Sequence, residues 1–154
     1  MHPAIVDPLA LDRQVCFALA VTNRAVLAVY RPLLEPMGLT HPQYLVMLAL
    51  WEQSPRSVKN IGSALTLDSP TLSPLLKRLE ASGLLERTRS VSDERQLDIA
   101  LTERGAALRK EAEKIPAAVV ARLGVDLSVL EELRAVLTRV NNAALDAKET
   151  GAQI

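Results

Sequence analysis

The chain has 154 residues, of which 49% are hydrophobic and 23% charged, fractions typical of a folded globular protein. Its 18 Lys and Arg balance its 18 Asp and Glu, so the net charge indicates no particular partner. No uninterrupted apolar run reaches the roughly 18 residues that cross a bilayer, so we expect no membrane insertion and a cytoplasmic location. One cysteine and two histidines provide neither a disulfide framework nor enough ligands for a zinc site, and we expect no metal or cofactor.

The first predicted helix is long and apolar. Asp7 is a good N-cap, and Pro8 stands at the first helical position. The apolar stretch ends near Gly38, and Pro32 is expected to kink it. Because aromatic residues are only 3% of the chain, the core must rest on Leu, Val, Ala and Ile, which favours helices elsewhere too.

Three shorter helices follow in the sequence. The pattern predicts one from Gln43 to about Gln53, a short one capped by Ser57, and a third over residues 70–81. Asp68 is the predicted N-cap of the third helix, and Gly83 is expected to close it.

The pattern then changes to short segments. Residues 84–89 and 96–101 are expected to pair as a β-hairpin with a polar tip over 90–95. Thr102 caps the next predicted helix, which runs to about Leu123 and is interrupted by Pro116. The last helix ends near Ala147, and the tail after it is expected to fray.

This order of elements predicts a mainly α fold: a winged helix-turn-helix carried between long terminal helices. We assign residues 39–102 to the winged helix-turn-helix region. Residues 1–38 and 103–154 form a predicted helical region that makes a homodimer, because both long helices are too apolar to stand alone. The whole is one domain of about residues 9–147.

In a helix-turn-helix, the N-terminal residues of the second helix contact base edges in the major groove. Here that helix offers small hydroxyls and two cations, and the hairpin adds arginines. Residues 56–110 carry ten basic and seven acidic side chains, an excess that favours local phosphate binding. The predicted DNA-binding residues are Ser69, Pro70, Thr71, Ser73, Lys77, Arg78, Arg87, Arg89, Asp93 and Arg95.

The single cysteine, Cys16, is either a small core residue or a reactive thiol. About two turns into the predicted helix, it lies beyond the reach of the helix dipole. Arg13, three residues earlier, is the nearest cation that would favour a thiolate. Tyr30 shares its helix face but lies about 21 Å away along the axis, so the two can meet only if the helix breaks or a second subunit supplies Tyr30.

Several stretches resemble the MarR family of bacterial regulators and, within it, the organic-hydroperoxide-sensing repressors. The resemblance covers residues 11 to about 145. The wing motif is shared widely in the family, whereas the motifs around Cys16 and at the reading helix are much more specific. The stretches are Leu11-Asp12-Arg13-Gln14-Val15-Cys16-Phe17, Tyr30-Arg31-Pro32-Leu33-Leu34, Gly38-Leu39-Thr40-His41-Pro42-Gln43-Tyr44, Leu67-Asp68-Ser69-Pro70-Thr71-Leu72-Ser73-Pro74-Leu75-Leu76-Lys77-Arg78-Leu79-Glu80 and Ser92-Asp93-Glu94-Arg95.

The resemblance implies a homodimeric repressor that binds an inverted-repeat operator in double-stranded DNA. Arg95 would enter the minor groove, oriented by Asp93. Cys16 matches the family's peroxide-reactive cysteine, which an organic hydroperoxide converts to a sulfenate before DNA is released. Tyr30 matches a tyrosine that hydrogen-bonds this cysteine across the dimer.

The sequence departs from the family pattern at three positions. His41 stands where a second tyrosine is common, Ala20 where another aromatic residue is common, and Pro70 where glycine is common. If protonated, His41 would favour the thiolate electrostatically. With no second cysteine, the sulfenate must meet a low-molecular-weight thiol, a backbone nitrogen or further oxidation.

Other functions stay open at this point. One is a MarR-type repressor gated by a small phenolic ligand, with Cys16 structural. Another is a thiol enzyme, although the sequence contains no Gly-rich phosphate loop, no Gly-x-Ser-x-Gly elbow and no His-Glu-x-x-His motif, and we expect no enzyme. A third is a dimerisation module without DNA affinity, which the wing arginines disfavour.

Overall fold

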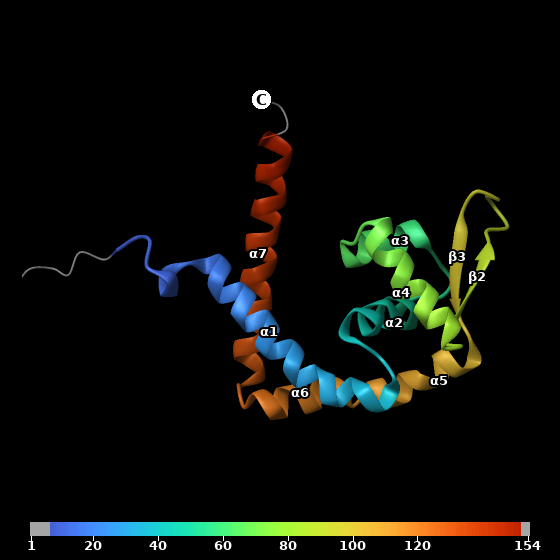
Figure 1. Cartoon of the computed structure of the whole chain (residues 1–154), viewed down its shortest axis with the longest axis horizontal. Helices are drawn as coiled ribbons and strands as arrows, with labels where there is room; N and C mark the ends of the chain where they lie inside the picture. Colours follow the sequence, from blue (N-terminus) through green and yellow to red (C-terminus); the bar gives the residue numbers. More distant parts are fainter. Residues whose placement is uncertain (1–6, 152–154) are drawn as a thin grey trace, which may run out of the picture. The chain divides into compact units, whose positions relative to one another are not determined.

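The computed structural model describes residues 7–151, which fall into two compact units, one ending at Ile115 and the other beginning at Pro116 (Figure 1). The predicted site residues lie in the first unit. His2 and the last three residues of the tail lie outside the described residues. The elements of the first unit are η1 (Leu11–Arg13), α1 (Val15–Leu34), η2 (Glu35–Met37), α2 (His41–Glu52), β1 (Arg56–Ser57), α3 (Val58–Leu65), α4 (Ser69–Ala81), β2 (Leu85–Arg89), β3 (Leu97–Leu101) and α5 (Glu103–Ala112), and those of the second are α6 (Ile115–Leu123) and α7 (Leu127–Gly151).

The first α-helix begins at Val15, seven residues later than expected. Asp7 and Pro8 lie in a turn instead, in which the Asp7 carboxylate accepts a 2.9 Å hydrogen bond from the Leu9 N–H. Gln14 is the residue before α1, and its side-chain amide donates to the Pro8 and Ala10 carbonyl oxygens. The strong capping pair at Asp7 therefore closes a local turn.

The three helices of the helix-turn-helix follow their capping signals closely. Thr40 and Gln43 form a reciprocal capping box at the start of α2. Ser57 caps α3, and Asp68 caps α4 through a 2.8 Å bond from the Thr71 N–H. These helices bury the core of the first unit, and the largest side chains that are at most 1% exposed are Leu34, Met47, Leu50, Ile61, Leu72, Leu79 and Ile99.

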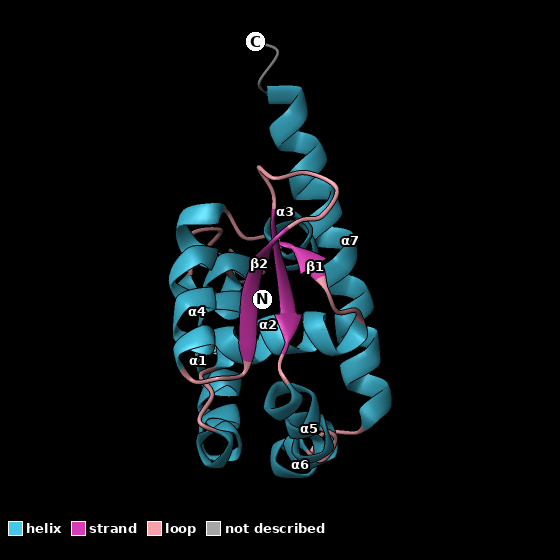
Figure 2. Ribbon diagram, turned by 90° about the vertical axis from the view of Figure 1, so that its right-hand side faces the viewer, coloured by secondary structure: helices cyan, strands magenta, loops and turns pink. Residues whose placement is uncertain are grey.

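The expected hairpin is part of a three-stranded antiparallel sheet with the order β1-β3-β2 (Figure 2). β2 and β3 pair from Leu85 opposite Leu101 to Arg89 opposite Leu97, which confirms the hairpin, and the connecting segment 90–96 is one residue longer than the expected 90–95. The sequence analysis missed β1, because a two-residue strand carries no periodic pattern. The mainly α winged helix-turn-helix fold is confirmed.

The chain turns sharply from α4 into β2. Gly83 takes the left-handed conformation, with φ of 74°. The Leu84 N–H donates to the Leu79 carbonyl oxygen and the Gly83 N–H to that of Glu80, which is the Schellman arrangement at a helix end. This joint sets the position of the wing, the hairpin of β2, β3 and the segment 90–96 between them, relative to α4.

Two features of the C-terminal helices differ in degree from expectation. The long helix predicted from Arg104 is broken between Ala112 and Ile115, just before Pro116, as its proline indicated. The last helix, α7, continues to Gly151, so the expected fraying from Lys148 is not found in the described residues.

The stretch Val15–Met37 is long and apolar enough, by length and composition alone, to cross a membrane. Arg24 and Arg31 interrupt it, so no uninterrupted apolar run within it reaches the length of a membrane span. One such helix near the N-terminus is weak evidence for a membrane span.

Candidate nucleic-acid interface and cysteine site

The start of α4 presents the polar side chains expected to meet bases. The hydrogen bond from Thr71 lowers the pKa of the Asp68 carboxyl, so this N-cap stays ionised. Pro74 is accommodated inside α4, which continues beyond it to Ala81. Of the predicted contact residues on this helix, Ser73 is half-buried, and the exposed ones are Ser69, Pro70, Thr71, Lys77 and Arg78.

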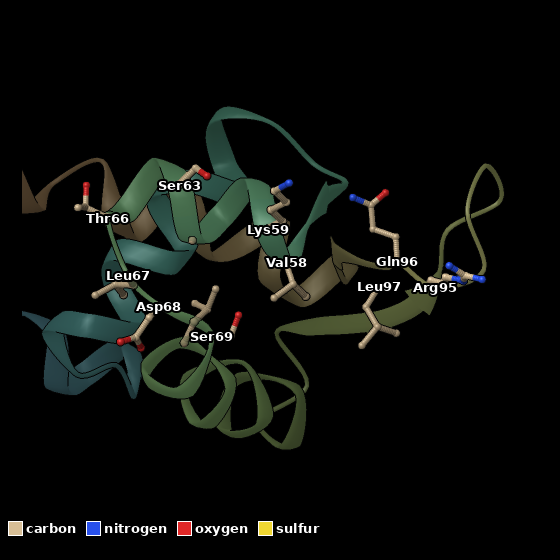
Figure 3. Close-up of a pocket in the computed structure, with 12 residues that line it drawn as sticks. Val58, Lys59, Ser63, Thr66, Leu67, Asp68, Ser69, Arg95, Gln96 and Leu97 are labelled. Atoms are coloured by element: carbon tan, nitrogen blue, oxygen red, sulfur yellow. The ribbon is translucent and has the colours of Figure 1, made fainter. Parts of the chain in front are cut away.

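A groove of about 980 Å³ separates this helix start from the wing. Figure 3 shows Lys59 of α3 and Ser69 of α4 on one side and Gln96 and Arg95 of the wing on the other. The lining combines apolar residues, among them Leu67, Leu72 and Leu97, with polar ones. The start of α4 and the wing, the two elements predicted to contact DNA, therefore line the same groove.

The tip of the wing is shaped by Asp93. Its carboxylate accepts a 3.0 Å hydrogen bond from the backbone N–H of Arg95, and its carbonyl oxygen accepts one from the Gln96 N–H. Asp93 therefore orients Arg95 through the main chain of the turn rather than through its guanidinium. Arg89 and Arg95 are both exposed.

Two arginines that the sequence analysis counted as free cations have protein partners. Arg87 of β2 forms a bidentate ion pair with Glu80 of α4. Its Nε lies 3.1 Å from Oε2 of Glu80, and its Nη2 lies 3.0 Å from Oε1. The Arg56 side chain is 9% exposed and lies 3.6 Å from the Glu52 carboxylate. Local charge counts do not distinguish such paired arginines from free ones.

The sequence analysis also passed over polar residues of the groove. Lys59 and Gln96 line it, although neither belongs to a quoted motif. The sequence did offer a signal for Lys59. It is the second residue of the helix that Ser57 caps, and its side chain is exposed at the helix start.

Cys16 is exposed and is the second residue of α1. The expectation that it lies about two turns inside the helix was wrong, because the helix begins at Val15. In the first turn of a helix, unpaired N–H groups and the helix dipole stabilise negative charge. Arg13 lies in η1, directly before this turn.

Tyr30 and His41, two of the three residues expected to support Cys16, are neighbours of each other. The rings of Tyr30 and His41 meet edge to face with centroids 4.9 Å apart, and Tyr44 lies 6.1 and 6.2 Å from them. Within one chain, Cys16 and Tyr30 stand near opposite ends of α1, fourteen helical residues or about 21 Å apart. The structure therefore brings together Tyr30 and His41 and leaves Cys16 apart from them.

His41 is half-buried, and this burial lowers the pKa of its imidazole. At neutral pH the ring is uncharged, so it is a hydrogen-bonding group rather than the cation considered from the sequence. His41 also lines a groove of about 440 Å³ with Leu27, Arg31 and Thr40.

Comparison with known proteins identifies relatives that are transcriptional regulators. A model of the transcriptional regulator SarA/Rot family matches residues 28–112. The chain is 50% identical over 131 residues to the HTH-type transcriptional regulator TtmR of Methylorubrum extorquens, covering 85% of this chain and 66% of TtmR. It is 44% identical over 128 residues to the organic hydroperoxide resistance transcriptional regulator of Bacillus subtilis, covering 83% and 85%.

Among solved structures, the chain resembles AbfR of Staphylococcus epidermidis. Reduced AbfR bound to DNA matches with a TM-score of 0.77 and 36% identity, covering 88% of this chain and 93% of AbfR. Overoxidized AbfR bound to DNA and disulfide-formed AbfR match with TM-scores of 0.66 and 0.60, both at 39% identity and 84% of this chain, covering 95% and 91% of AbfR. The chain therefore belongs to the MarR family of winged-helix transcriptional regulators, in the group that contains the organic hydroperoxide resistance regulator.

Proposed function

We propose that this regulator is a homodimeric repressor that binds an inverted-repeat operator and releases it when an organic hydroperoxide oxidises Cys16. The observation that carries the proposal is the position of Cys16, exposed in the first turn of α1, in a chain 44% identical to an organic hydroperoxide resistance regulator. Such a protein acts in the cytoplasm, where its operator lies.

Dimer formation is supported by apolar faces that the chain itself leaves uncovered. On α1, Phe17 is 40% and Leu19 41% exposed, and α7 has no buried residue at all within its described length. Apolar stripes of this kind are stable in water only when another surface covers them. We assign dimerisation to residues 1–38 and 103–154 and DNA reading to residues 39–102. The exposed stripe residues of α7 are Leu127, Val129, Leu133, Val136, Leu137, Val140 and Leu145.

DNA binding is supported by the groove between α4 and the wing. The exposed hydroxyls at the start of α4 suit base edges in the major groove, and Lys77 and Arg78 suit phosphates. Arg95 at the wing tip suits the minor groove, whose narrow A·T-rich stretches attract arginine. The AbfR relatives have been solved on DNA in two chemical states.

The proposed sensing step conserves atoms and electrons. The Cys16 sulfur attacks the terminal oxygen of the hydroperoxide, the O–O bond breaks, and the alcohol leaves with the thiol proton, giving a sulfenic acid. A low-molecular-weight thiol then displaces water and forms a mixed disulfide. The exposure of Cys16 at the start of α1 leaves its sulfur accessible to the hydroperoxide.

We further propose that Tyr30 and His41 of the partner subunit receive Cys16 across the dimer. Their edge-to-face packing on α1 and the start of α2 forms a joint polar and aromatic wall. The neutral imidazole of His41 offers a donor and an acceptor to the sulfur or its oxygen. The 21 Å along α1 in one chain is bridged if two α1 helices pack antiparallel.

The test measures duplex binding by fluorescence anisotropy, on a sequence that the reduced protein selects from a randomised pool. Cumene hydroperoxide followed by cysteine is expected to release the wild-type protein, whereas C16S stays bound. R13Q serves as a matched variant on the turn beside Cys16, and we expect it to slow oxidation without abolishing it. Release of C16S by the same treatment would contradict the proposal.

A second candidate function is favoured by the groove of about 440 Å³ that Arg31 and His41 line. Its size and its cation suit a small phenolic carboxylate, which would gate DNA binding with Cys16 structural. Salicylate added to C16S separates the two: release by salicylate and not by hydroperoxide supports the ligand-gated repressor. We propose a stoichiometric switch and not an enzyme, and sustained loss of cumene hydroperoxide with excess thiol would contradict that.

A further inference from the structure

We propose that Arg87 is a positioning residue for DNA reading: its ion pair with Glu80 holds the wing at a fixed place beside α4, so that both elements engage one duplex together. This role differs from the phosphate contact expected from the sequence, and it rests on the proposed DNA-binding function. The clamp is defined as the pair Glu80 and Arg87, which the sequence analysis did not connect with each other.

The geometry of the clamp occupies the guanidinium. Nε donates to Oε2 at 3.1 Å and Nη2 to Oε1 at 3.0 Å, so one edge of the guanidinium faces both carboxylate oxygens. The Arg87 side chain is 29% exposed and that of Glu80 38%. A phosphate that used the same edge of the guanidinium would therefore have to displace a carboxylate that already meets it with two aligned hydrogen bonds.

The electrostatics explain why the two residues belong together. Glu80 lies in the last turn of α4, where the negative end of the helix dipole disfavours a carboxylate. The hydrogen bonds from Arg87 lower the pKa of Glu80, and Glu80 in turn raises the pKa of Arg87. These interactions favour the charged form of both side chains.

The clamp spans the joint between helix and wing. The chain turns at Gly83, and Glu80 precedes the turn while Arg87 follows it on the neighbouring strand. Two residues that follow β3 also hold the turn. The Thr102 hydroxyl donates a 2.6 Å hydrogen bond to the Gly83 carbonyl oxygen, and Arg104 donates a 3.0 Å hydrogen bond to that of Ser82. The ion pair adds a further link between α4 and β2 across this turn. Figure 1 shows α4 beside the hairpin.

A fixed joint raises affinity in the way that a short, stiff linker does. Once α4 sits in the major groove, a wing held in place reaches the adjacent backbone without first losing conformational freedom. Arg89 and Arg95 are exposed further along the hairpin and stay available for the duplex. The clamp therefore acts through them.

The variant E80Q distinguishes the two roles of Arg87, because they predict opposite signs. If Arg87 positions the wing, E80Q loosens the clamp and weakens binding of the selected duplex about fivefold. If Arg87 contacts a phosphate, removing a nearby carboxylate strengthens binding. The charge-reversed pair E80R/R87E is expected to regain most of the lost affinity, which a phosphate contact at position 87 would not allow.

Two further readouts separate positioning from general damage to the fold. The ratio of affinities for the selected and a scrambled duplex should fall in E80Q, whereas a loss of folded protein lowers both affinities alike. The salt slope of binding should stay unchanged in E80Q and fall by about one per lost contact in the matched variant R89Q. Unchanged or tighter binding by E80Q overturns the clamp while leaving DNA binding intact, and no duplex bound by the wild-type protein overturns both.

Discussion

The indole N–H of Trp51 donates a 2.9 Å hydrogen bond to the carbonyl oxygen of Gly105, although 54 residues separate the two. The bond ties the end of α2 to the first turn of α5, where the chain leaves the wing. Gly105 is also pressed against the other arm of the hairpin. A Cβ there would overlap the Leu84 carbonyl oxygen and lie 3.3 Å from Leu101 Cδ2.

We therefore predict that G105A lowers the free energy of unfolding by about 2 to 3 kcal/mol, because Leu84 or α5 must shift to admit the methyl group. The gain in helix propensity, about 1 kcal/mol, does not offset this. Urea unfolding at one fixed protomer concentration measures it. The matched control is G151A, where a Cβ meets nothing within 4 Å, and equal stability of the two variants would refute the close approach.

Removing only the hydrogen bond should have a smaller effect. W51F keeps an aromatic ring against Tyr44, whose centroid is 6.4 Å away, and leaves the Gly105 carbonyl oxygen without its donor. We expect a loss of about 1 kcal/mol in the free energy of unfolding. Far-UV circular dichroism is the suitable probe, since the variant has no tryptophan. A variant as stable as the wild type would show that the bond contributes nothing net.

Asp68 gives the fold a dependence on acid. Because the hydrogen bond from Thr71 lowers the pKa of Asp68 below 3.8, its contribution to stability is present above that value and is lost as the pH falls through the lower folded value. D68N keeps a good N-cap but does not titrate. We expect the wild-type melting temperature to fall more than that of D68N between pH 5 and pH 3. Parallel curves for the two proteins would contradict the assignment.

His41 acts in a higher range of pH. Burial lowers its pKa below 6.5, so on acidification the unfolded chain takes up a proton before the folded chain does. Stability should therefore fall as the pH drops below 6.5, and H41N should flatten that part of the curve. Urea midpoints from pH 7.5 to 5.5 test this, with Y44F as a neighbouring variant that keeps the imidazole. A wild-type curve as flat as that of H41N would mean that the ring is not desolvated.

The sequence predicted the fold well wherever a local signal had a local cause. The caps at Ser57 and Asp68, the left-handed Gly83 and the hairpin all depend on groups a few residues apart. The helix start predicted at Asp7 was wrong, because a good N-cap residue followed by proline is as typical of a turn as of a helix. That single error also placed Cys16 too deep in α1.

Contacts between side chains of different helices and strands were not predictable from the sequence. Nothing near Arg87 shows that its guanidinium meets Glu80 across a turn, or that Arg56 is largely buried, so both counted as free cations. The contact between Tyr30 of α1 and His41 of α2 was likewise not predictable from the sequence. The residue types of the candidate site could be chosen from the sequence, but their pairing depends on packing between elements.

The oxidised protein should need a small thiol before it leaves DNA. Cys16 is the only cysteine, so its sulfenic acid has no partner in the chain with which to form a disulfide. A single added oxygen changes the bulk at the start of α1 far less than a disulfide-linked cysteine does. We expect cumene hydroperoxide alone to leave most of the duplex bound, and cysteine added afterwards to release it as the mixed-disulfide mass appears. C16S with the same additions is the control. Complete release by hydroperoxide alone, before any mixed disulfide is detected by mass spectrometry, would show that the sulfenic acid itself is sufficient.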